Sequence, residues 1–469
     1  MKTRGTRILG WIAAALVLLI VVPWTVGNAV EGSRLRATLK NLAARGWPMT
    51  VAQLRAPALP DEQNAALVLN RAFLLMSGGK TESGALDPAV RELVEYRLGA
   101  DQAEKDLARL DATAVASLRR KMEAGPVKEI LATLHEAALR PAADFRPDYA
   151  QGPTLLIPQA SQVRNAVRLL CLDAWLKAEL GDGAGALAEL DDALAVGWSV
   201  SNDRLLICFL VACACDNMTI DSLQSVLSRL PPARIPEESR AALNRRLAAH
   251  RAAVKTVLTG ALDGERIGLG DWFFDQVLNG RMSVPEFHAL VSMTGQPEAG
   301  RAAARLAETA VIWVYLHPAR PLLKADYRFY LETLAAMRES VAEVPAAGAP
   351  WTPWKDPPIP RCAVMTKLIL PALGSCLRKG VEWETKLDLA ILGLELENAV
   401  AANGTYPAEL PGGAVRTLDP FSGKAFVYRP ATNSVLLYSV GPDGRDDGGV
   451  AKMNATNPGV DLVWRVERP

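Results

Sequence analysis

The sequence predicts a mainly α-helical protein with three parts: an N-terminal transmembrane helix, a domain of α-helical hairpins, and a small C-terminal α+β module with a helix on a short antiparallel sheet. Three observations support this fold class. The chain begins with a long uncharged apolar stretch, its middle repeats apolar residues three and four positions apart, and its end changes to the two-residue period of strands. The expected units are residues 1–30, 31–343, 344–360 and 361–469.

Composition and charge exclude several classes of function. The 469 residues are 50% hydrophobic and 22% charged, which is enough apolar side chain for a buried core. The chain has 52 Lys and Arg residues and 51 Asp and Glu residues. Its net charge of +1 therefore gives no general attraction to nucleic acid. The four His and six Cys are scattered, which favours neither a metalloenzyme nor a disulfide scaffold. We expect no nucleic-acid partner.

The N-terminal segment has the features of a membrane anchor. Its uncharged stretch begins at Ile8 and ends at Val30, and about 23 helical residues suffice to cross roughly 30 Å of hydrocarbon. The flanking charges, Lys2, Arg4 and Arg7, all lie on the N-terminal side. By the positive-inside rule, the N-terminus stays in the cytoplasm and the body is exported. We therefore expect a single-pass protein of the cell inner membrane with a periplasmic body.

A cleaved signal peptide is the alternative reading of the same segment. Gly27 and Ala29 would occupy the small-residue positions of a cut before Val30, and Pro23 would end the apolar region. The protein would then be secreted or periplasmic and carry no anchor. The uncharged run continues past Pro23, which favours the uncleaved anchor.

Helical periodicity dominates the next 300 or so residues. The pattern predicts a helical piece over 35–59, a helix over 64–76 with Asp61 as its N-cap, and a helix that starts at Asp87-Pro88. The best-defined unit is a hairpin, with helices over 166–180 and 184–196 joined at Gly181-Asp182-Gly183, followed by a helix over 205–230. The hairpin resembles a tetratricopeptide-type helix pair, although no array at that period follows.

The Pro-rich segment 344–360 separates this domain from the C-terminal module. It contains six prolines interleaved with Trp351 and Trp354, a density that no helix or central strand tolerates. We expect an extended connector that its two tryptophans hold against a domain.

The C-terminal module is predicted as one helix followed by three strands. The helix over 383–403 ends at Asn403-Gly404, and the strands fall at 425–429, 435–440 and 460–466. The order of a long helix, Asn-Gly-x-Tyr-Pro, Asp419-Pro420-Phe421 and Leu-Tyr-Ser-Val-Gly-Pro-Asp-Gly at 437–444 resembles the C-terminal half of the major pseudopilins of type II secretion systems. This resemblance implies a calcium-binding acidic loop and a link to secretion. The whole layout resembles single-anchor envelope proteins of planctomycete-type bacteria, which implies no activity.

The acidic loop is the one candidate metal site. Asp443, Asp446 and Asp447 fall within five residues among glycines, and Asp461 begins the last predicted strand. Ca²⁺ takes six to eight oxygen ligands from carboxylates and carbonyls on such loops. The competing interpretation is a solvated turn with Arg445 as a partial counter-charge.

No catalytic motif was found by pattern. His135, His250, His288 and His317 lie in separate segments, where we expect surface or helix-cap positions, and Glu265-Arg266 is expected to close a helix junction as an ion pair. The cysteines are expected to be buried thiols. We therefore expect a membrane-anchored interaction or scaffold protein with a protein partner on its helical domain and no identified small-molecule substrate. The alternative is an exported hydrolase whose site is assembled from scattered residues of that domain.

Overall fold

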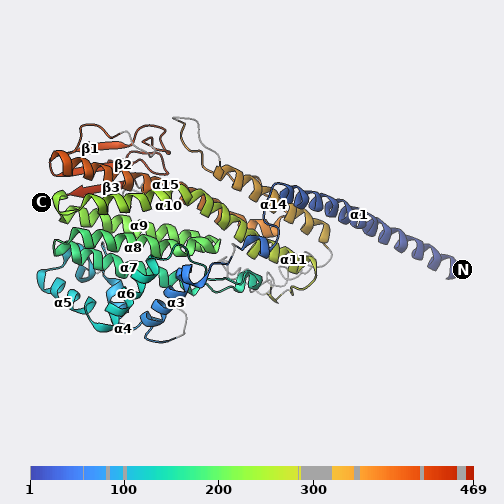
Figure 1. The fold of residues 1–469 in the computed structure, drawn as a ribbon. Coiled ribbons are helices and arrows are strands. Elements are labelled where there is room, and N and C mark those ends of the chain that lie inside the picture. Colours follow the sequence, from blue (N-terminus) through green and yellow to red (C-terminus); the bar gives the residue numbers. More distant parts are fainter. Residues whose placement is uncertain are drawn as a thin grey trace.

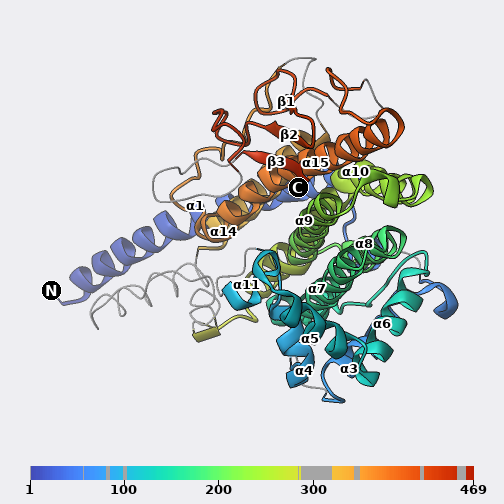
Figure 2. The ribbon, with the colours of Figure 1, turned by 90° about the vertical axis from the view of Figure 1, so that its left-hand side faces the viewer.

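A computed structural model describes residues 2–55, 58–80, 85–98, 103–283, 285–286, 319–342, 349–411, 417–450 and 461–468. Figures 1 and 2 show a stack of long helices, with a small sheet at one side and a single helix, α1, that extends away from the body. Several predictions fall outside the described residues. They concern His288, His317, residues 344–348, and Val460 at the start of the third predicted strand.

The described part of the chain is mainly helical, as the sequence predicts. Its α-helices are α1 (Lys2–Ala44), α2 (Val51–Leu54), α3 (Ala65–Met76), α4 (Pro88–Glu95), α5 (Ala112–Met122), α6 (Gly125–Ala138), α7 (Pro158–Glu179), α8 (Gly183–Trp198), α9 (Leu206–Arg229), α10 (Glu237–Glu265), α11 (Trp272–Leu278), α14 (Arg320–Ala342) and α15 (Val364–Asn403). The short 3₁₀ turns are η1 (Asp61–Gln63), η2 (Ala103–Lys105), η3 (Leu107–Arg109), η4 (Tyr149–Thr154), η5 (Ser199–Asp203) and η6 (Pro232–Arg234), and η7 (Arg266–Asp271) is a π-turn. The strands are β1 (Val427–Pro430), β2 (Ser434–Ser439) and β3 (Leu462–Glu467).

Capping residues explain where several helices begin and end. Asp87 accepts a hydrogen bond from the Ala89 amide at 2.9 Å and starts α4, as predicted. Asp182 starts α8 in the same way. Gly404 ends α15 with φ at 77°, a left-handed conformation that glycine adopts without strain. The predicted cap at Asp61 is wrong, because that residue lies in η1 and the Asn64 side chain caps α3 instead.

The first helix is longer than predicted. It continues through Pro23 to Ala44 without a break, so the apolar segment and the next polar residues form one helix about 65 Å long. The predicted helical piece over 35–59 is therefore wrong in extent, since only α2 follows before Pro60.

The second half of α1 packs against α14 (Figure 1). The Lys324 ammonium donates to the Asn28 side chain at 2.7 Å, and the Arg328 guanidinium pairs with Glu31 at 3.3 Å. A further ion pair joins Arg45 to Glu339. These contacts begin where the uncharged stretch ends, so that α14 holds the polar part of α1 and leaves the apolar part beyond it.

Helix α9 is at the centre of the body. Within the described residues it is the one helix long and apolar enough to cross a membrane by length and composition. However, 61% of that apolar stretch is buried inside the protein, against α7, α8, α10 and α15. Burial by protein neighbours explains its hydropathy, and α9 lies inside the domain rather than at the N-terminus where the anchor is predicted.

The three strands form an antiparallel sheet in the order β1-β2-β3. The sheet confirms the prediction of one helix followed by a small antiparallel sheet, with the strand bounds shifted by a few residues at most. Its inner face packs on α15, where Trp464 is fully buried against Gly393. Because a Cβ at Gly393 would lie 2.1 Å from the indole, only glycine allows this close packing.

Helix α9 closes the free edge of β3. The Arg465 amide donates to the Gln224 side chain at 2.7 Å, and the Glu467 amide donates to the Ser228 hydroxyl at 3.2 Å. Gln224 and Ser228 are four residues apart and therefore lie on one face of α9. The amides of Arg465 and Glu467 are two residues apart and point to the same side of β3, so each meets one of these two side chains. An edge that would otherwise expose unpaired amides is thus satisfied by side chains of the helical body.

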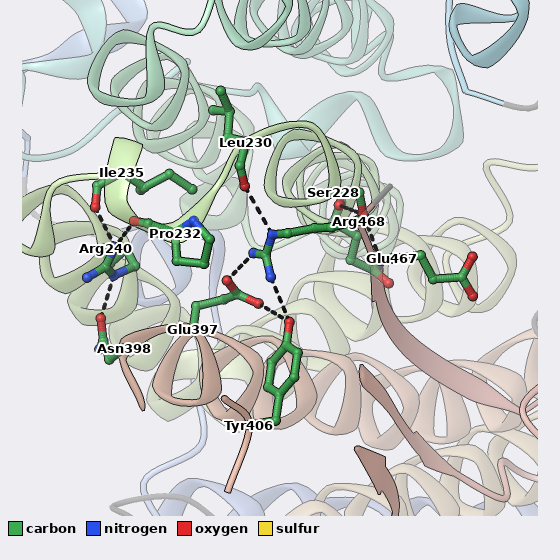
Figure 3. Close-up of polar contacts among 11 residues, drawn as sticks. Ser228, Leu230, Pro232, Ile235, Arg240, Glu397, Asn398, Tyr406, Glu467 and Arg468 are labelled. Atoms are coloured by element: carbon green, nitrogen blue, oxygen red, sulfur yellow. Dashed lines mark hydrogen bonds and ion pairs between the residues drawn. The ribbon is translucent and has the colours of Figure 1, made fainter. Parts of the chain in front are cut away.

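A buried ion pair closes the same junction (Figure 3). The Arg468 guanidinium bonds to the Glu397 carboxylate of α15, to the Tyr406 hydroxyl at 2.9 Å and to the Leu230 carbonyl at 3.0 Å. The Tyr406 hydroxyl also donates to Glu397 at 2.8 Å. Burial of the ring raises the pKa of Tyr406, and the carboxylate beside it acts in the same direction.

The described part of the Pro-rich segment lies against the C-terminal module. The Trp351 amide donates to the Pro420 carbonyl at 2.6 Å, and the Trp351 ring meets Phe421 edge-on. One hydrophobic core runs from α1 through α9 and α15 to β3. The segment therefore connects two parts of the chain that share a core, and whether those parts fold separately stays a prediction.

We predict that Arg468→Met lowers the free energy of unfolding by about 3–5 kcal/mol, because the variant leaves the Glu397 charge buried without its cation. The Glu397 side chain is 1% exposed. Urea unfolding followed by circular dichroism measures this loss. Adding Glu397→Leu should restore most of it. The control is Glu467→Ala, which removes an exposed partner of Arg465 and should change stability by less than about 0.5 kcal/mol. If Arg468→Met and Glu467→Ala lowered the free energy of unfolding equally, the pair of Arg468 and Glu397 would not act as a buried ion pair.

We also predict that limited proteolysis cuts first within residues 344–360 and that the two fragments stay associated, because α15 and β3 pack on α9 and α10. Size-exclusion chromatography of the nicked protein measures this association. Fragments that separate without denaturant would instead indicate that residues 361–469 are an independent domain.

Candidate functional site

A buried histidine–aspartate pair joins three central helices. The His250 Nδ1 atom of α10 lies 3.0 and 3.1 Å from the two carboxylate oxygens of Asp216 in α9. The Trp383 indole of α15 donates to the same carboxylate at 2.9 Å. Asp216 is fully buried, so these donors replace the water that an isolated carboxylate would need.

The surroundings of His250 fix the orientation of its ring. Trp198 stacks on the imidazole with ring centroids 4.0 Å apart, and it also contacts Trp383. Because a carboxylate accepts only, Nδ1 must carry the proton that it shares with Asp216. In the neutral imidazole, Nε2 is then the acceptor.

His250 lines a cavity of about 240 Å³ between the start of α3, the end of α6, the end of α8, and α10. Its apolar lining residues are Ala65, Leu69, Ala137, Pro141, Ala142, Ala143, Ala195, Val196 and Trp198. The polar and charged lining residues are Arg140, Ser199, Asn202, Arg246 and His250. Among the described residues that line the cavity none is acidic, and the two charged ones, Arg140 and Arg246, are paired with Glu136 and Asp191.

The Ser199 hydroxyl is the other unusual group of this cavity. Ser199 is 6% exposed, and its Oγ atom is buried without a hydrogen-bond partner in the described structure. A buried hydroxyl left unsatisfied costs about 1–3 kcal/mol. Ser199 and His250 are both among the residues that line the cavity, but the Ser199 Oγ atom itself is buried within the protein.

A second histidine shares a separate charged cluster. His135 Nε2 lies 3.0 Å from Glu189, and the Lys177 ammonium contacts the same carboxylate. The Glu189 contact raises the pKa of His135. Asp192 lies beside this cluster, and burial raises its pKa to about 6. These charges compensate one another, as in a structural ion-pair network.

The strongly perturbed acids do not gather in the cavity. Burial raises the pKa of Asp203 to about 7 and that of Glu265 to about 7, as it raises that of Asp192. None of the three lines the cavity. A cleft with two such acids, which would favour acid–base hydrolysis, is not formed by the residues that the structure describes.

An ion pair closes the helix junction as predicted, but Arg266 forms it with Asp271 rather than with Glu265. The Arg266 guanidinium, fully buried, bonds to Asp271 at 2.6 Å within the π-turn η7 and to the Pro48 carbonyl. Asp271 also accepts from the Tyr327 hydroxyl of α14 at 2.8 Å. The cluster joins α10, α11 and α14, which is a structural role.

Three of the four acidic side chains of the loop, those of Asp443, Asp446 and Asp461, accept hydrogen bonds from the protein. Asp461 accepts hydrogen bonds from the amides of Asp447, Gly449 and Val450, so the loop closes onto β3. Asp446 accepts from the Gly448 amide and the Tyr438 hydroxyl, which lower its pKa. The Asp443 side chain accepts from the Arg445 amide, which is the cap of a turn.

The calcium prediction therefore stays open. Among the described residues, no group of three or more His, Cys, Asp or Glu side chains is arranged to hold a metal ion. Residues 451–460, which lie between the loop and Asp461, are outside the described part. The Asp447 Oδ2 atom is buried without a hydrogen-bond partner in the described chain, so that one of the four predicted ligands has an unused oxygen.

Sequence reasoning missed the pair of His250 and Asp216. The prediction of a surface or cap position is wrong for His250, which is 4% exposed. A signal was present, because His250 continues the apolar stripe of α10 formed by Leu243, Leu247, Val254 and Leu258. A polar residue on the buried face of a helix requires a partner, but the sequence does not say which. The six cysteines are free thiols, five of them buried, largely as predicted.

Comparison with known protein families, curated proteins and solved structures finds no match to this chain.

We predict that calcium, if the acidic loop binds it, raises the free energy of unfolding by about 2.7 kcal/mol at a hundredfold excess over Kd. Thermal melting of the full chain in calcium and in EDTA measures the effect, and Asp446→Asn and Asp447→Asn should abolish the difference. Asp461→Asn is a poor probe, because it disturbs three backbone hydrogen bonds with or without the ion. A melting temperature that EDTA does not move, or moves equally in the variants, would identify the loop as a solvated turn.

Proposed function

We propose that this protein is a single-pass, membrane-anchored interaction protein whose body lies outside the cytoplasm. The observation that supports it most is the division of α1. Its polar half is held by α14, while its apolar half extends away from the body and exposes large side chains, with Trp11 77%, Leu19 73% and Leu18 59% exposed. Such an apolar surface is unstable in water and favourable in a bilayer.

The charges at the chain start support the proposed orientation. Lys2, Arg4 and Arg7 precede the apolar stretch, and Glu31, its first following charge, belongs to the part of α1 that contacts α14. The N-terminus is then cytoplasmic and the body periplasmic. In this arrangement the bilayer surface lies near Asn28, where the contacts with α14 begin.

Interaction rather than turnover is proposed for the body. Its long helices pack side by side and offer extended surfaces to a partner. More specifically, the hairpins would be of the tetratricopeptide type, and the pairing of α7 with α8 supports this. The helix-and-sheet module at the C-terminus supports the pseudopilin resemblance, and with it a link to secretion, by its order of elements. Cross-linking in intact cells followed by purification from detergent tests for a protein partner, and recovery of the chain alone would count against a scaffold.

An exported hydrolase is the second candidate, and one observation favours it. His250 is paired with the buried Asp216 and is among the residues that line a cavity, and a general base needs both a partner of this kind and access to a substrate. No hydrogen bond joins His250 to the nearby Ser199 hydroxyl in the described structure, so a nucleophile in place is not part of this observation. Reaction of Ser199 with a fluorophosphonate, lost in His250→Gln, would support hydrolysis.

We predict that Leu18→Asp with Leu19→Asp releases the protein from the membrane. Two charges near the centre of the span cost about 5–7 kcal/mol on the insertion scale. Alkaline extraction of membranes followed by immunoblotting measures the release. The control is Leu139→Asp, which places the same charge at an 84% exposed leucine of the body and should leave the protein membrane-bound.

A protease assay tests the orientation of the protein. Protease added to spheroplasts should degrade the body. Without protease, an N-terminal tag should remain attached to the body if the helix is uncleaved. Extraction of the unmodified chain at high pH, or full protection of its body, would contradict the proposed anchor and orientation.

A further inference from the structure

We infer that Arg36, Arg320 and Lys324 form a binding site for the phosphate group of an anionic phospholipid at the junction of α1 and α14. This inference rests on the proposed membrane anchor and adds the class of lipid that the protein binds. It depends on where these three cations lie, on the partners of their neighbours, and on their distance from the apolar stretch of α1.

The three cations lie together at one end of the interface between α1 and α14. The Lys324 ammonium donates to the Asn28 side chain at 2.7 Å, which brings it against α1. A Cβ atom at Gly32 would lie 3.2 Å from the Lys324 Nζ atom and 3.5 Å from an Arg36 Nη atom, so these two charges are neighbours. Arg320 is exposed and precedes Lys324 by four residues, which places both on one face of α14.

The charges of this cluster act on one another. Burial lowers the pKa of Lys324, and the nearby charges of Arg320 and Arg36 lower it further. In the described structure the Lys324 ammonium bonds to two uncharged oxygens, the carbonyl and the side-chain oxygen of Asn28. An ammonium group has three donors, so one N–H remains for an anion.

Two acids lie close to the cluster in the sequence, and both have other partners. Glu31 pairs with Arg34 at 2.7 Å and with Arg328 at 3.3 Å. Asp326 is 1% exposed and accepts from the Met365 amide at 2.9 Å. Across the part of the chain that the structure describes, no ion pair includes a member of the cluster. The three positive charges are therefore available to an external anion.

The position of the cluster selects a lipid as the source of that anion. Pro321 lies against Gly27, so α14 begins beside the last turn of the apolar stretch, where α1 leaves the body (Figure 1). With the bilayer surface near Asn28, Gly32 lies about 6 Å further along α1. The headgroup region extends roughly 5–8 Å beyond the hydrocarbon on each side. The lipid phosphates of this leaflet therefore lie at the depth of the cluster.

Charge and apolar contact define the class of lipid. A zwitterionic headgroup has an ammonium group of its own, which three cations repel, whereas phosphatidylglycerol has none. Trp24 is 37% exposed and precedes Asn28 by one turn, on the side of the apolar stretch. A lipid whose phosphate lies on the cluster can place its acyl chains along this apolar surface. A soluble phosphate gains no such contact.

Native mass spectrometry of the full chain in an uncharged detergent tests this inference. The probes are phosphatidylglycerol, phosphatidylcholine, which adds a cation, and glycerol 3-phosphate, which lacks acyl chains. We expect phosphatidylglycerol to bind at least about tenfold more tightly than either of the others, because each cation near an anionic headgroup contributes roughly a fivefold preference. Equal binding of the two lipids, or equal binding of glycerol 3-phosphate, would overturn the inference.

Two variants of the cluster connect the preference to its charges. The triple variant Arg36→Gln, Arg320→Gln, Lys324→Gln should weaken phosphatidylglycerol binding at least about tenfold and leave phosphatidylcholine binding unchanged. The variant Arg36→Lys, Arg320→Lys keeps all three charges and should bind phosphatidylglycerol within about twofold of the unmodified chain. Unchanged binding by the triple Gln variant would overturn the inference.

A matched control removes three exposed cations of the body, as Lys80→Gln, Lys128→Gln and Arg245→Gln. The control has the same net charge as the triple variant of the cluster, and we expect it to bind phosphatidylglycerol as the unmodified chain does. Equal losses in the two triple variants would indicate a general attraction by net charge and would overturn the site.

Alkaline extraction of membranes separates this inference from the proposed anchor. The triple variant of the cluster keeps the apolar stretch of α1 and should stay membrane-bound. If the unmodified chain resists extraction but binds the three probes equally, the lipid site is overturned and the anchor stands. If high pH extracts the unmodified chain, the anchor is overturned, and the lipid site with it.

Discussion

The buried carboxylate of Asp216 sets the arrangement of the central helices. A charge with no access to water costs several kcal/mol unless hydrogen bonds replace its hydration. Its donors come from two other helices, His250 of α10 and Trp383 of α15, so both must pack on α9 in one register. An apolar contact would tolerate a shift of one helix along another, whereas this set of hydrogen bonds does not. His250 is also among the residues that line the cavity, so the core and the candidate site share this residue.

The sheet depends on the same helix through its backbone. A three-stranded sheet with an open edge is marginal on its own, because the amides of an edge strand lack partners. Gln224 and Ser228 of α9 supply those partners, and the pair of Arg468 and Glu397 closes the junction at the chain end. The C-terminal module is thus completed by groups that lie 238 to 241 residues earlier in the chain, since Arg468 also bonds to the Leu230 carbonyl. This explains how one hydrophobic core includes both parts.

Local signals in the sequence predicted most helices and strands. They did not predict which side chains of different helices contact one another. Asp87, Asp182 and Gly404 act on backbone groups within a few residues, so their roles follow from the sequence alone. Asn64 was missed in favour of Asp61 because both are good caps and only the packed position of η1 decides between them. The partners His250 and Asp216 lie on different helices, where periodicity shows that each faces the core but not that they meet. The acidic loop could be predicted only in part. Its closure by Asp461 follows from the position of that residue at the start of the last strand. A metal-binding arrangement depends on residues outside the described part.

The division of α1 bears on whether its apolar segment is retained. The candidate cleavage site before Val30 lies within one continuous helix. The residues around it contact α14, where Gly27 faces Pro321, Asn28 accepts from Lys324 and Glu31 pairs with Arg328. Cleavage there would remove the first two of these contacts and begin the mature chain inside the helix that α14 holds. A helix that is continuous from the apolar stretch into a packed interface also fixes the orientation of the body, because no loop between them absorbs a rotation. These contacts support a retained anchor that holds the body in a defined orientation at the membrane surface.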